Sequence, residues 1–525
     1  MSELRCYFFV TEDMSILSLP DLVWLEVFRD WLTLKGVCTI DTALSTKQYG
    51  REILSSFYAS PFFQSLVTRD LSDFCQEVDH KILVFLDWLK LRNCRVNELG
   101  VTVDSYDLSE TKVYPFVTRC NFTSFIHQQI GVESHMTEMF ASFPNLTTIV
   151  LGLHVTLGLV RKLSLAPSSY SLKSIRFLQP LEDYHSESET TASLLQLLER
   201  YKNSIEYFET VDFWSAPLMQ FIYSSCPRIT YMHHSVNHTV TNTIFMGCLY
   251  AAAFRIEEIN VTSMVTDMDI VHIAPELTSL KRIYLSGPDG SAFTYRSIVA
   301  LCSHCQHIEF AMCAGIELAK WQYYKTGVIG FDLQLSSQSG LSSLSDVHVL
   351  FSVLPPLHTL TLSYCDEEIA NGLCCSAATP SLQSLRALCI SDQAVCFATE
   401  LLSLLSECRL LELLSFDDVN HHHTKALTND KWNRLMTAVF KHCKGISALQ
   451  LRGLKRFKTD DFTKLIAEMP VLSRLKIDHM NLDMRMIDKY IKRHKLSCQV
   501  CSSGVPSLMI QKDYSLYNTF VYFDW

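Results

Sequence analysis

The side chains best suited to chemistry in this sequence are a run of cysteines and histidines near residue 302. Cys302 and Cys305 have the Cys-x-x-Cys spacing that forms half of many zinc sites, and His307 follows closely. The wider sequence favours a different role, because the position of Cys305 recurs. Equivalent cysteines, three residues before the first apolar residue of a strand-like segment, are Cys226, Cys408 and Cys443. A cysteine that recurs with a repeat is a packing residue, so we predict no metal here.

Other motifs that could support chemistry are weaker. His494, Cys498 and Cys501 have a spacing that suits a metal-binding turn, but no fourth ligand is evident, and we prefer buried thiols. Three adjacent histidines at 421–423 cannot all face one ion on regular structure, so a solvated loop is expected there. Glycine-rich phosphate loops, Gly-x-Ser-x-Gly elbows and paired zinc-ligand motifs do not occur in the sequence. We therefore predict no catalytic residue, no metal, no cofactor and no enzymatic activity.

The elements that must position any functional residue come from a recurring apolar pattern. A Cys or other apolar residue precedes two variable residues, and then apolar residues follow at i, i+3 and i+5, as in Leu357, Leu360 and Leu362. The first apolar residues of the clearest units are Leu146, Leu172, Ile205, Ile229, Ile256, Leu280, Ile308, Leu357, Leu385, Leu411, Ile446 and Leu472. Most are 24 to 28 residues apart, which is the period of leucine-rich repeats.

Each repeat is expected to contain one strand and one helix. The i, i+3, i+5 spacing suits a short strand with alternate side chains turned inward. Between these segments the apolar period becomes helical, for example at Ser193 to Tyr201, and Thr266 is a good helix cap. The 49-residue gap after Ile308 should contain one more strand near Phe331 and Leu333, and a weaker early unit is expected around Leu99. The pattern predicts an α/β solenoid.

These features resemble a known family. Helices that open with Thr-Asp, followed by Cys-x-x-Leu-x-x-Leu-x-Leu, are similar to the cysteine-containing leucine-rich repeats of F-box proteins, and Cys365 matches the cysteine that ends the strand in that family. The resemblance covers roughly residues 91 to 497 and is strongest after Cys226. It implies a leucine-rich-repeat horseshoe that holds a target protein.

The N-terminal region resembles the F-box that gives this family its name. Leu-Pro stands at the start, an apolar pair follows at Val27 and Phe28, and Leu22, Leu25, Phe28 and Leu32 have helical spacing. One departure is the absence of the usual Val-Cys and Trp from the last helix, where Asp41 to Leu44 stand instead. The resemblance implies that the module docks on a Skp-type adaptor and so joins a cullin ubiquitin ligase. The residues that would contact the adaptor are Leu19, Pro20, Leu22, Leu25, Val27, Phe28, Leu32 and Val37.

The expected organisation has five parts. A tail at 1–14 precedes a small all-α F-box-like module at 15–60 and a helical connector at 61–90, and the solenoid then occupies 91–497. A cap or tail at 498–525 completes the chain, and its β-prone sequence is expected to cover the exposed edge of the last repeat.

Composition limits the partners and the compartment. The net charge of −10 provides no general basic field, so we expect neither nucleic-acid nor membrane binding. Residues 441–495 carry 14 Lys or Arg and 6 Asp or Glu, a local balance of +8 that either binds an acidic or phosphorylated partner or is an ordinary solvated face. No secretory signal is evident at the N-terminus, so the 19 cysteines are expected to be reduced thiols in the cytoplasm or nucleus.

Strand positions between the inward residues should form a concave face, where solenoids usually bind their partners. Tyr and Arg, which are enriched at binding hot spots, occur repeatedly at these positions. The candidate target-binding residues are Tyr207, Tyr231, His233, Arg282, Tyr284, Phe310, Arg452, Arg474 and Lys476.

Taken together, these features predict a non-catalytic recognition subunit, in which the F-box-like module binds the adaptor and the repeats bind a target protein. The alternative is a leucine-rich-repeat scaffold in which the N-terminal helices only cap the end of the solenoid.

Overall fold

The computed structural model describes residues between Leu86 and Gln511, and the adaptor-binding candidates Leu19 to Val37 lie outside that part of the chain. Within it, the structure does not describe residues 88–89, 92–98, 103–112, 124–139, 153–156, 166–170, 179–186, 211–212, 236–239, 263–264, 287–292, 314, 323–328, 392–393, 395–400, 418–428, 443–444, 453–457, 470, 473, 479–485, 487–488, 491–492, 495–497 and 503–505. The chain divides into two compact units, one of residues 1–231 with 237–244 and the other of residues 232–236 with 245–525.

The first unit contains a parallel five-stranded sheet in the order β1-β2-β3-β4-β5. Its elements are β1 (Leu99–Thr102), β2 (Arg119–Thr123), β3 (Thr148–Gly152), α7 (Leu157–Leu165), β4 (Ser174–Phe177), α8 (Glu187–Tyr201), β5 (Tyr207–Thr210) and α9 (Ala216–Ser225). The early unit expected around Leu99 is confirmed as β1. The expected helix at Ser193 to Tyr201 is confirmed within the longer α8.

The second unit continues the alternation of strands and helices along a larger sheet. Its elements begin with β6 (Tyr231–Ser235), α10 (Asn242–Ala252), β7 (Glu258–Thr262), α11 (Asp267–Ile273), β8 (Arg282–Leu285), α12 (Tyr295–His304), β9 (Phe310–Cys313), β10 (Ile316–Gln322) and β11 (Ile329–Leu335). They continue with α13 (Leu344–Val353), β12 (Thr359–Leu362), α14 (Glu367–Cys375), α15 (Pro380–Gln383), β13 (Ala387–Ser391), α16 (Leu402–Glu407), β14 (Leu413–Asp417), α17 (Asn429–His442), β15 (Ala448–Arg452), α18 (Thr459–Glu468), β16 (Arg474–Asp478), β17 (Cys498–Ser502) and β18 (Pro506–Gln511).

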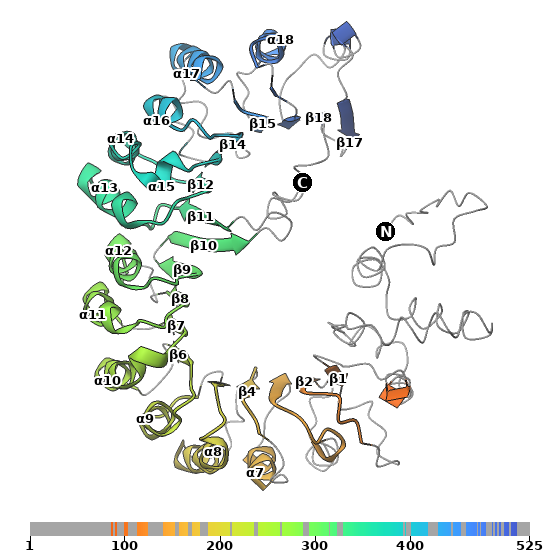
Figure 1. Cartoon of the computed structure of the whole chain (residues 1–525), viewed down its shortest axis with the longest axis vertical. Helices are drawn as coiled ribbons and strands as arrows, with labels where there is room; N and C mark the ends of the chain where they lie inside the picture. The colour runs from red at the N-terminus through yellow and green to blue at the C-terminus, as the bar shows by residue number, and fades with distance from the viewer. Residues whose placement is uncertain are drawn as a thin grey trace, which may run out of the picture. The chain divides into compact units, whose positions relative to one another are not determined.

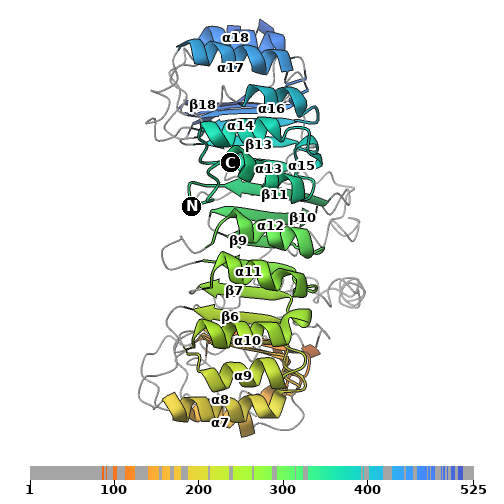
Figure 2. The ribbon, with the colours of Figure 1, turned by 90° about the vertical axis from the view of Figure 1, so that its left-hand side faces the viewer.

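The sheet of the second unit is mixed but mainly parallel. Its thirteen strands have the order β17-β18-β16-β15-β14-β13-β12-β11-β10-β9-β8-β7-β6. In this unit the described helices follow one another along one face of the sheet, and the strands form the other layer (Figures 1 and 2). This mixed α/β structure with parallel strands is compatible with the expected solenoid.

Alternation within each strand explains why the sequence pattern specifies this arrangement. In β12, Leu360 and Leu362 are buried while Thr359 and Thr361 are only half-buried, and the preceding Leu357 is buried as well. The i, i+3, i+5 leucines therefore supply the layer between sheet and helices. Burial of such side chains is the main stabilising contribution available to a repeat that touches only its neighbours.

Helix caps follow the sequence signals. Thr266 caps α11 with a full capping box, in which its side chain accepts from the Asp269 amide and the Asp269 carboxylate accepts from the Thr266 amide. Ser343 and Asp366 cap α13 and α14 in the same way, through side chains that accept from an amide three residues later. The cap expected at Thr266 is confirmed.

An antiparallel hairpin interrupts the parallel series between β9 and β12. The strand expected near Phe331 and Leu333 is confirmed as β11, but β10 is an additional strand that pairs antiparallel with both β9 and β11. Gly315, at a φ of 79°, makes the tight β9–β10 turn, where the left-handed backbone favours glycine. Gly330 lets the ring of Trp321 lie against the backbone, since an added Cβ would be 2.6 Å from that ring.

A second hairpin lies at the other end of this sheet. β18 pairs antiparallel with β16 and β17 pairs with β18, so the edge strand after the last parallel strand is covered. No helix within the described part of the chain is both long enough and apolar enough to cross a membrane.

Candidate protein-interaction face

We call the sheet surface opposite the helices the strand face, and it presents the residues that alternate with the buried leucines. In the first unit, whose boundary falls after Tyr231 at the start of β6, four strand-face residues form a connected group. The rings of Tyr207 and Tyr231 stack with centroids 3.9 Å apart and planes 15° apart. Arg176 Nε donates to Glu209 Oε2 at 2.7 Å, and its guanidinium lies 5.2 Å from the Tyr207 ring centroid. Parallel register places these residues together, because Arg176 pairs with Glu209 across β4 and β5.

This tyrosine–arginine group is largely satisfied by its own members. Tyr231 is only 2% exposed, and burial, with further contributions from Tyr207 and Glu209, raises the pKa of its hydroxyl. Burial alone would lower the pKa of Arg176, but the combined effect of Glu209, Tyr207 and Tyr231 outweighs burial and raises it. Tyr207 and Tyr231 therefore come together as the sequence predicts. Tyr231, however, offers little surface to a partner.

The second unit places Arg282, Tyr284 and Phe310 on neighbouring strands. Arg282 of β8 pairs in register with Phe310 of β9, and Tyr284 lies two residues further along β8 on the same face. Tyr284 and Phe310 are half-buried, and Arg282 is exposed. The Arg282 guanidinium lies 3.7 Å from Glu258 and 3.9 Å from Glu309, separations that leave it weakly paired in solvent. Two half-buried aromatic side chains and an accessible cation on neighbouring strands are thus available for binding.

The other predicted target-binding residues lie on strands of the same unit. His233 is half-buried on β6. Arg452 ends β15, and Arg474 and Lys476 lie on β16 opposite Ala448 and Gln450. Arg452, Arg474 and Lys476 therefore lie on strands, as the sequence predicts. The strands β9 to β14 separate them from Arg282 along the sheet.

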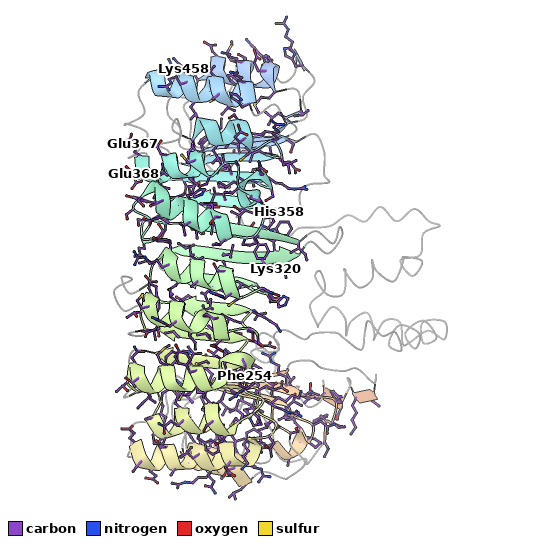
Figure 3. All side chains as sticks on the ribbon, turned by 60° about the vertical axis from the view of Figure 1, so that its left-hand side comes forward. Phe254, Lys320, His358, Glu367, Glu368 and Lys458 are labelled. Carbon is purple, nitrogen blue, oxygen red and sulfur yellow. The ribbon has the colours of Figure 1, made fainter. Side chains whose placement is uncertain are left out.

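The hairpin adds polar residues that the sequence analysis did not identify. Trp321 Nε1 donates to Asp332 at 2.9 Å, and the Trp321 ring meets the His358 ring edge-on at 5.5 Å. Burial raises the pKa of Asp332 although Thr359 and Trp321 donate to it. Burial, assisted by Arg386, lowers the pKa of His358, so its imidazole is neutral at pH 7. Figure 3 shows Lys320 and His358 on one side of the ribbon and Glu367 and Glu368, which begin helix α14, on the other.

This contact could not be predicted, because Trp321 lies on β10, the additional strand outside the repeat pattern, although its partner Asp332 lies on the expected strand β11. Arg176, in contrast, could have been found, because it stands between two buried strand residues and obeys the same alternation as Tyr207.

Among the recurring cysteines, Cys226, Cys305 and Cys408 are buried as their shared position predicts, and Cys443 lies outside the described residues. Cys305 Sγ donates to the Leu277 carbonyl at 3.4 Å, and Cys408 Sγ donates to the Leu382 carbonyl at 3.5 Å. Leu277 and Leu382 occupy the same position one repeat earlier, so each thiol links successive turns of the chain. Burial raises the pKa of Cys305 to about 11 and that of Cys302 to about 12, which disfavours the thiolates that bind zinc.

No group of three or more His, Cys, Asp or Glu side chains suited to a metal ion occurs in the part of the chain that the structure describes. Cys498 and Cys501 both lie on strand β17, and the histidines at 421–423 are outside the described residues.

Comparison with known proteins gives weak structural similarity and no match in sequence. No protein-family model and no curated protein matches the chain. Among solved structures, the chain is similar to a chain in the crystal structure of the Rad7 and Elc1 complex in yeast, with 12% sequence identity and a TM-score of 0.34. The similarity covers 80% of this chain and 93% of that chain. At this level it assigns neither a family nor a partner to the protein.

Proposed function

We propose that this protein is a non-catalytic recognition subunit of a cullin ubiquitin ligase, acting in the cytoplasm or nucleus. Its F-box-like module, residues 15–60, binds a Skp-type adaptor, and a leucine-rich-repeat horseshoe binds a target protein through the strand face. The F-box resemblance of Leu19 to Val37 supports the adaptor half of this proposal.

The single observation that carries the target-binding half is the group of Arg282, Tyr284 and Phe310, in which the cation is exposed and the two rings are half-buried. These side chains lie on two adjacent strands of a rigid sheet, so a partner would meet them already in place. Preorganised aromatic and Arg side chains lose little conformational entropy on binding, and they dominate the energetics of many protein interfaces. Weak pairing of Arg282 also leaves its charge available to an acidic group on the target.

The mechanism requires no chemistry from this chain. Two binding events on one scaffold raise the effective concentration of the target's lysines near the ligase's transfer centre.

Adaptor binding is tested by Leu19→Ala, Pro20→Ala, Val27→Ala and Phe28→Ala in one full-length variant. We expect capture of a purified Skp-type adaptor to fall at least about tenfold, since these residues would supply the apolar contact surface. Biolayer interferometry gives the measurement. Glu26→Ala with Arg29→Ala is the matched control, because these positions adjoin Val27 and Phe28 but lack apolar contact area.

If the intact protein does not bind the adaptor, the ligase role is wrong and the scaffold alternative takes its place. In that alternative the N-terminal helices cap the repeats, and the strand face still binds a partner.

Target binding is tested separately by Arg282→Ala, Tyr284→Ala and Phe310→Ala. We expect this variant to lose partners that the unaltered protein retains in quantitative affinity purification, with a loss of about tenfold or more for a target centred on these strands. Tyr250→Ala with Met268→Ala is the control, because both side chains are well exposed on helices. An unchanged set of partners in the triple variant would remove this surface from the proposal.

A further inference from the structure

The strands β13 and β14 depart from the alternating burial pattern of strands such as β4, β5, β9 and β12. In β4, β5, β9 and β12, buried residues alternate with half-exposed ones. In β13 and β14, four successive residues are buried. Both faces of these two strands are therefore shielded from water over four residues, whereas one face of β4, β5, β9 and β12 is partly open.

The shielded residues on the strand face form a small apolar cluster. We call Ala387, Cys389, Leu413 and Ala448 the apolar strip; they are 3 to 6% exposed and pack as one group. Ala387, Leu413 and Ala448 occupy one row across three strands, since they pair in register. They alternate with Leu388, Leu414 and Leu449, which are buried toward the helices. The strip thus lies on the same surface as the proposed target-binding residues.

The side chains of the strip cannot shield one another. Leu413 has an alanine on each side in its row, and a leucine between two methyl groups projects above them. On an open sheet face such a side chain would be well exposed. Helices do not account for the burial, because the described helices of this unit lie along the opposite face of the sheet (Figure 1). A covering segment on the strand face is required.

We propose that residues 512–525 of this chain lie over the apolar strip and cover it. This segment is rich in large apolar side chains: Tyr514, Leu516, Tyr517, Phe520, Val521, Tyr522, Phe523 and Trp525. Its only charged residues are Lys512, Asp513 and Asp524. A segment of this composition gains free energy when it leaves water for an apolar surface.

The path of the chain brings this segment to the correct edge of the sheet. β18 ends at Gln511, which pairs with Arg474, and Arg474 pairs with Ala448 of the strip. Ala387 is therefore four strands from Gln511, or roughly 19 Å at the usual strand spacing. Fourteen extended residues span up to about 48 Å, so the segment can cross the whole strip. The contact is independent of any role in a ubiquitin ligase.

This contact would restrict the surface that a target can use. With the strip occupied, partners of the strand face are confined to strands such as β8 and β9, which carry Arg282, Tyr284 and Phe310.

Cys389 provides a built-in reporter for the test. We expect a variant that ends at Gln511 to react with N-ethylmaleimide at Cys389 at least about tenfold faster than the full chain, as measured by peptide-resolved mass spectrometry. Added peptide 512–525 should restore the protection. Cys408, buried between repeats, is the internal control and should react at an unchanged rate. Unchanged reactivity of Cys389 would overturn the proposal.

A second measurement uses the full-length chain and does not depend on the truncated protein remaining folded. Phe520 is replaced by p-benzoylphenylalanine, and after irradiation the cross-linked peptides are identified. Intramolecular cross-links to residues 387–452 are the expected result. Cross-links elsewhere in the chain, or cross-links between two copies that increase with protein concentration, would show a different occupant of the strip and overturn the proposal.

Discussion

Replacing Gly372 with valine is expected to lower the free energy of unfolding of the second unit by about 3 kcal/mol. Gly372 is buried in α14 where this helix packs on α13 of the preceding repeat. An added Cβ would lie 2.6 Å from the Cβ of Val347, so even one carbon has no room without separating the two helices. Valine adds two further carbons and loses side-chain rotamers in a helix.

Chemical denaturation followed by circular dichroism gives the measurement. Gly247→Ala is the matched control, because Gly247 is also inside a helix but an added Cβ there has nothing within 4 Å. We expect that control to gain roughly 0.5 to 1 kcal/mol from reduced freedom of the unfolded chain. Adding Val347→Ala to the Gly372 variant should recover part of the loss. If Gly372→Val proves as harmless as the control, the close approach of α13 and α14 is wrong.

Asp267→Ala is expected to lower the free energy of unfolding by a similar amount, about 3 kcal/mol, because it removes a hydrogen-bonded carboxylate. Asp267 lies in the first turn of α11, and its carboxylate receives three hydrogen bonds from the next repeat. Thr294 donates its amide at 2.8 Å and its hydroxyl at 2.5 Å, and Ser297 donates its hydroxyl at 2.6 Å. Because Ser297 is completely buried, its hydroxyl would lose its acceptor without access to water.

The comparison variant lies in the same helical turn. Asp269→Ala removes the carboxylate that accepts from Thr266, the exposed cap of its own helix, and should cost about 1 kcal/mol. Thermal unfolding of the two variants side by side separates the roles. Equal losses would mean that Asp267 caps its helix and contributes nothing to the next repeat.

Much of the repeat architecture could be predicted because the pattern depends on local spacing. The leucines at 357, 360 and 362 fix a strand and its inward face, and Thr266 fixes a helix start, without any knowledge of distant residues. The strand β10 escaped prediction because Ile316 and Leu318 alternate without the Leu-x-x-Leu-x-Leu spacing, and no helix separates this strand from its neighbours.

The candidate site shows the same limit. Adjacent repeats bring Tyr207 beside Tyr231, as alternation and stacking predict. Exposure is different, because it depends on what covers a face. Tyr231 is almost completely buried. The apolar strip is also shielded, although it lies on a face that alternation alone would leave open. Spacing specifies which side of the sheet a residue occupies, and the rest of the fold determines whether water reaches it.

The hairpin between β9 and β12 also bears on how such a chain tolerates added sequence. Strand direction reverses once at β10 and again at β11, so β12 runs in the same direction as β9. Two reversals cancel, so the direction of the parallel strands is the same before and after the hairpin. Helix α13 therefore connects β11 to β12 in the same way that α12 connects β8 to β9. A single added strand would send the next helix to the opposite face and expose its apolar side. Insertions in this protein are therefore subject to a parity rule, under which strands can be gained in pairs without disturbing the repeats that follow.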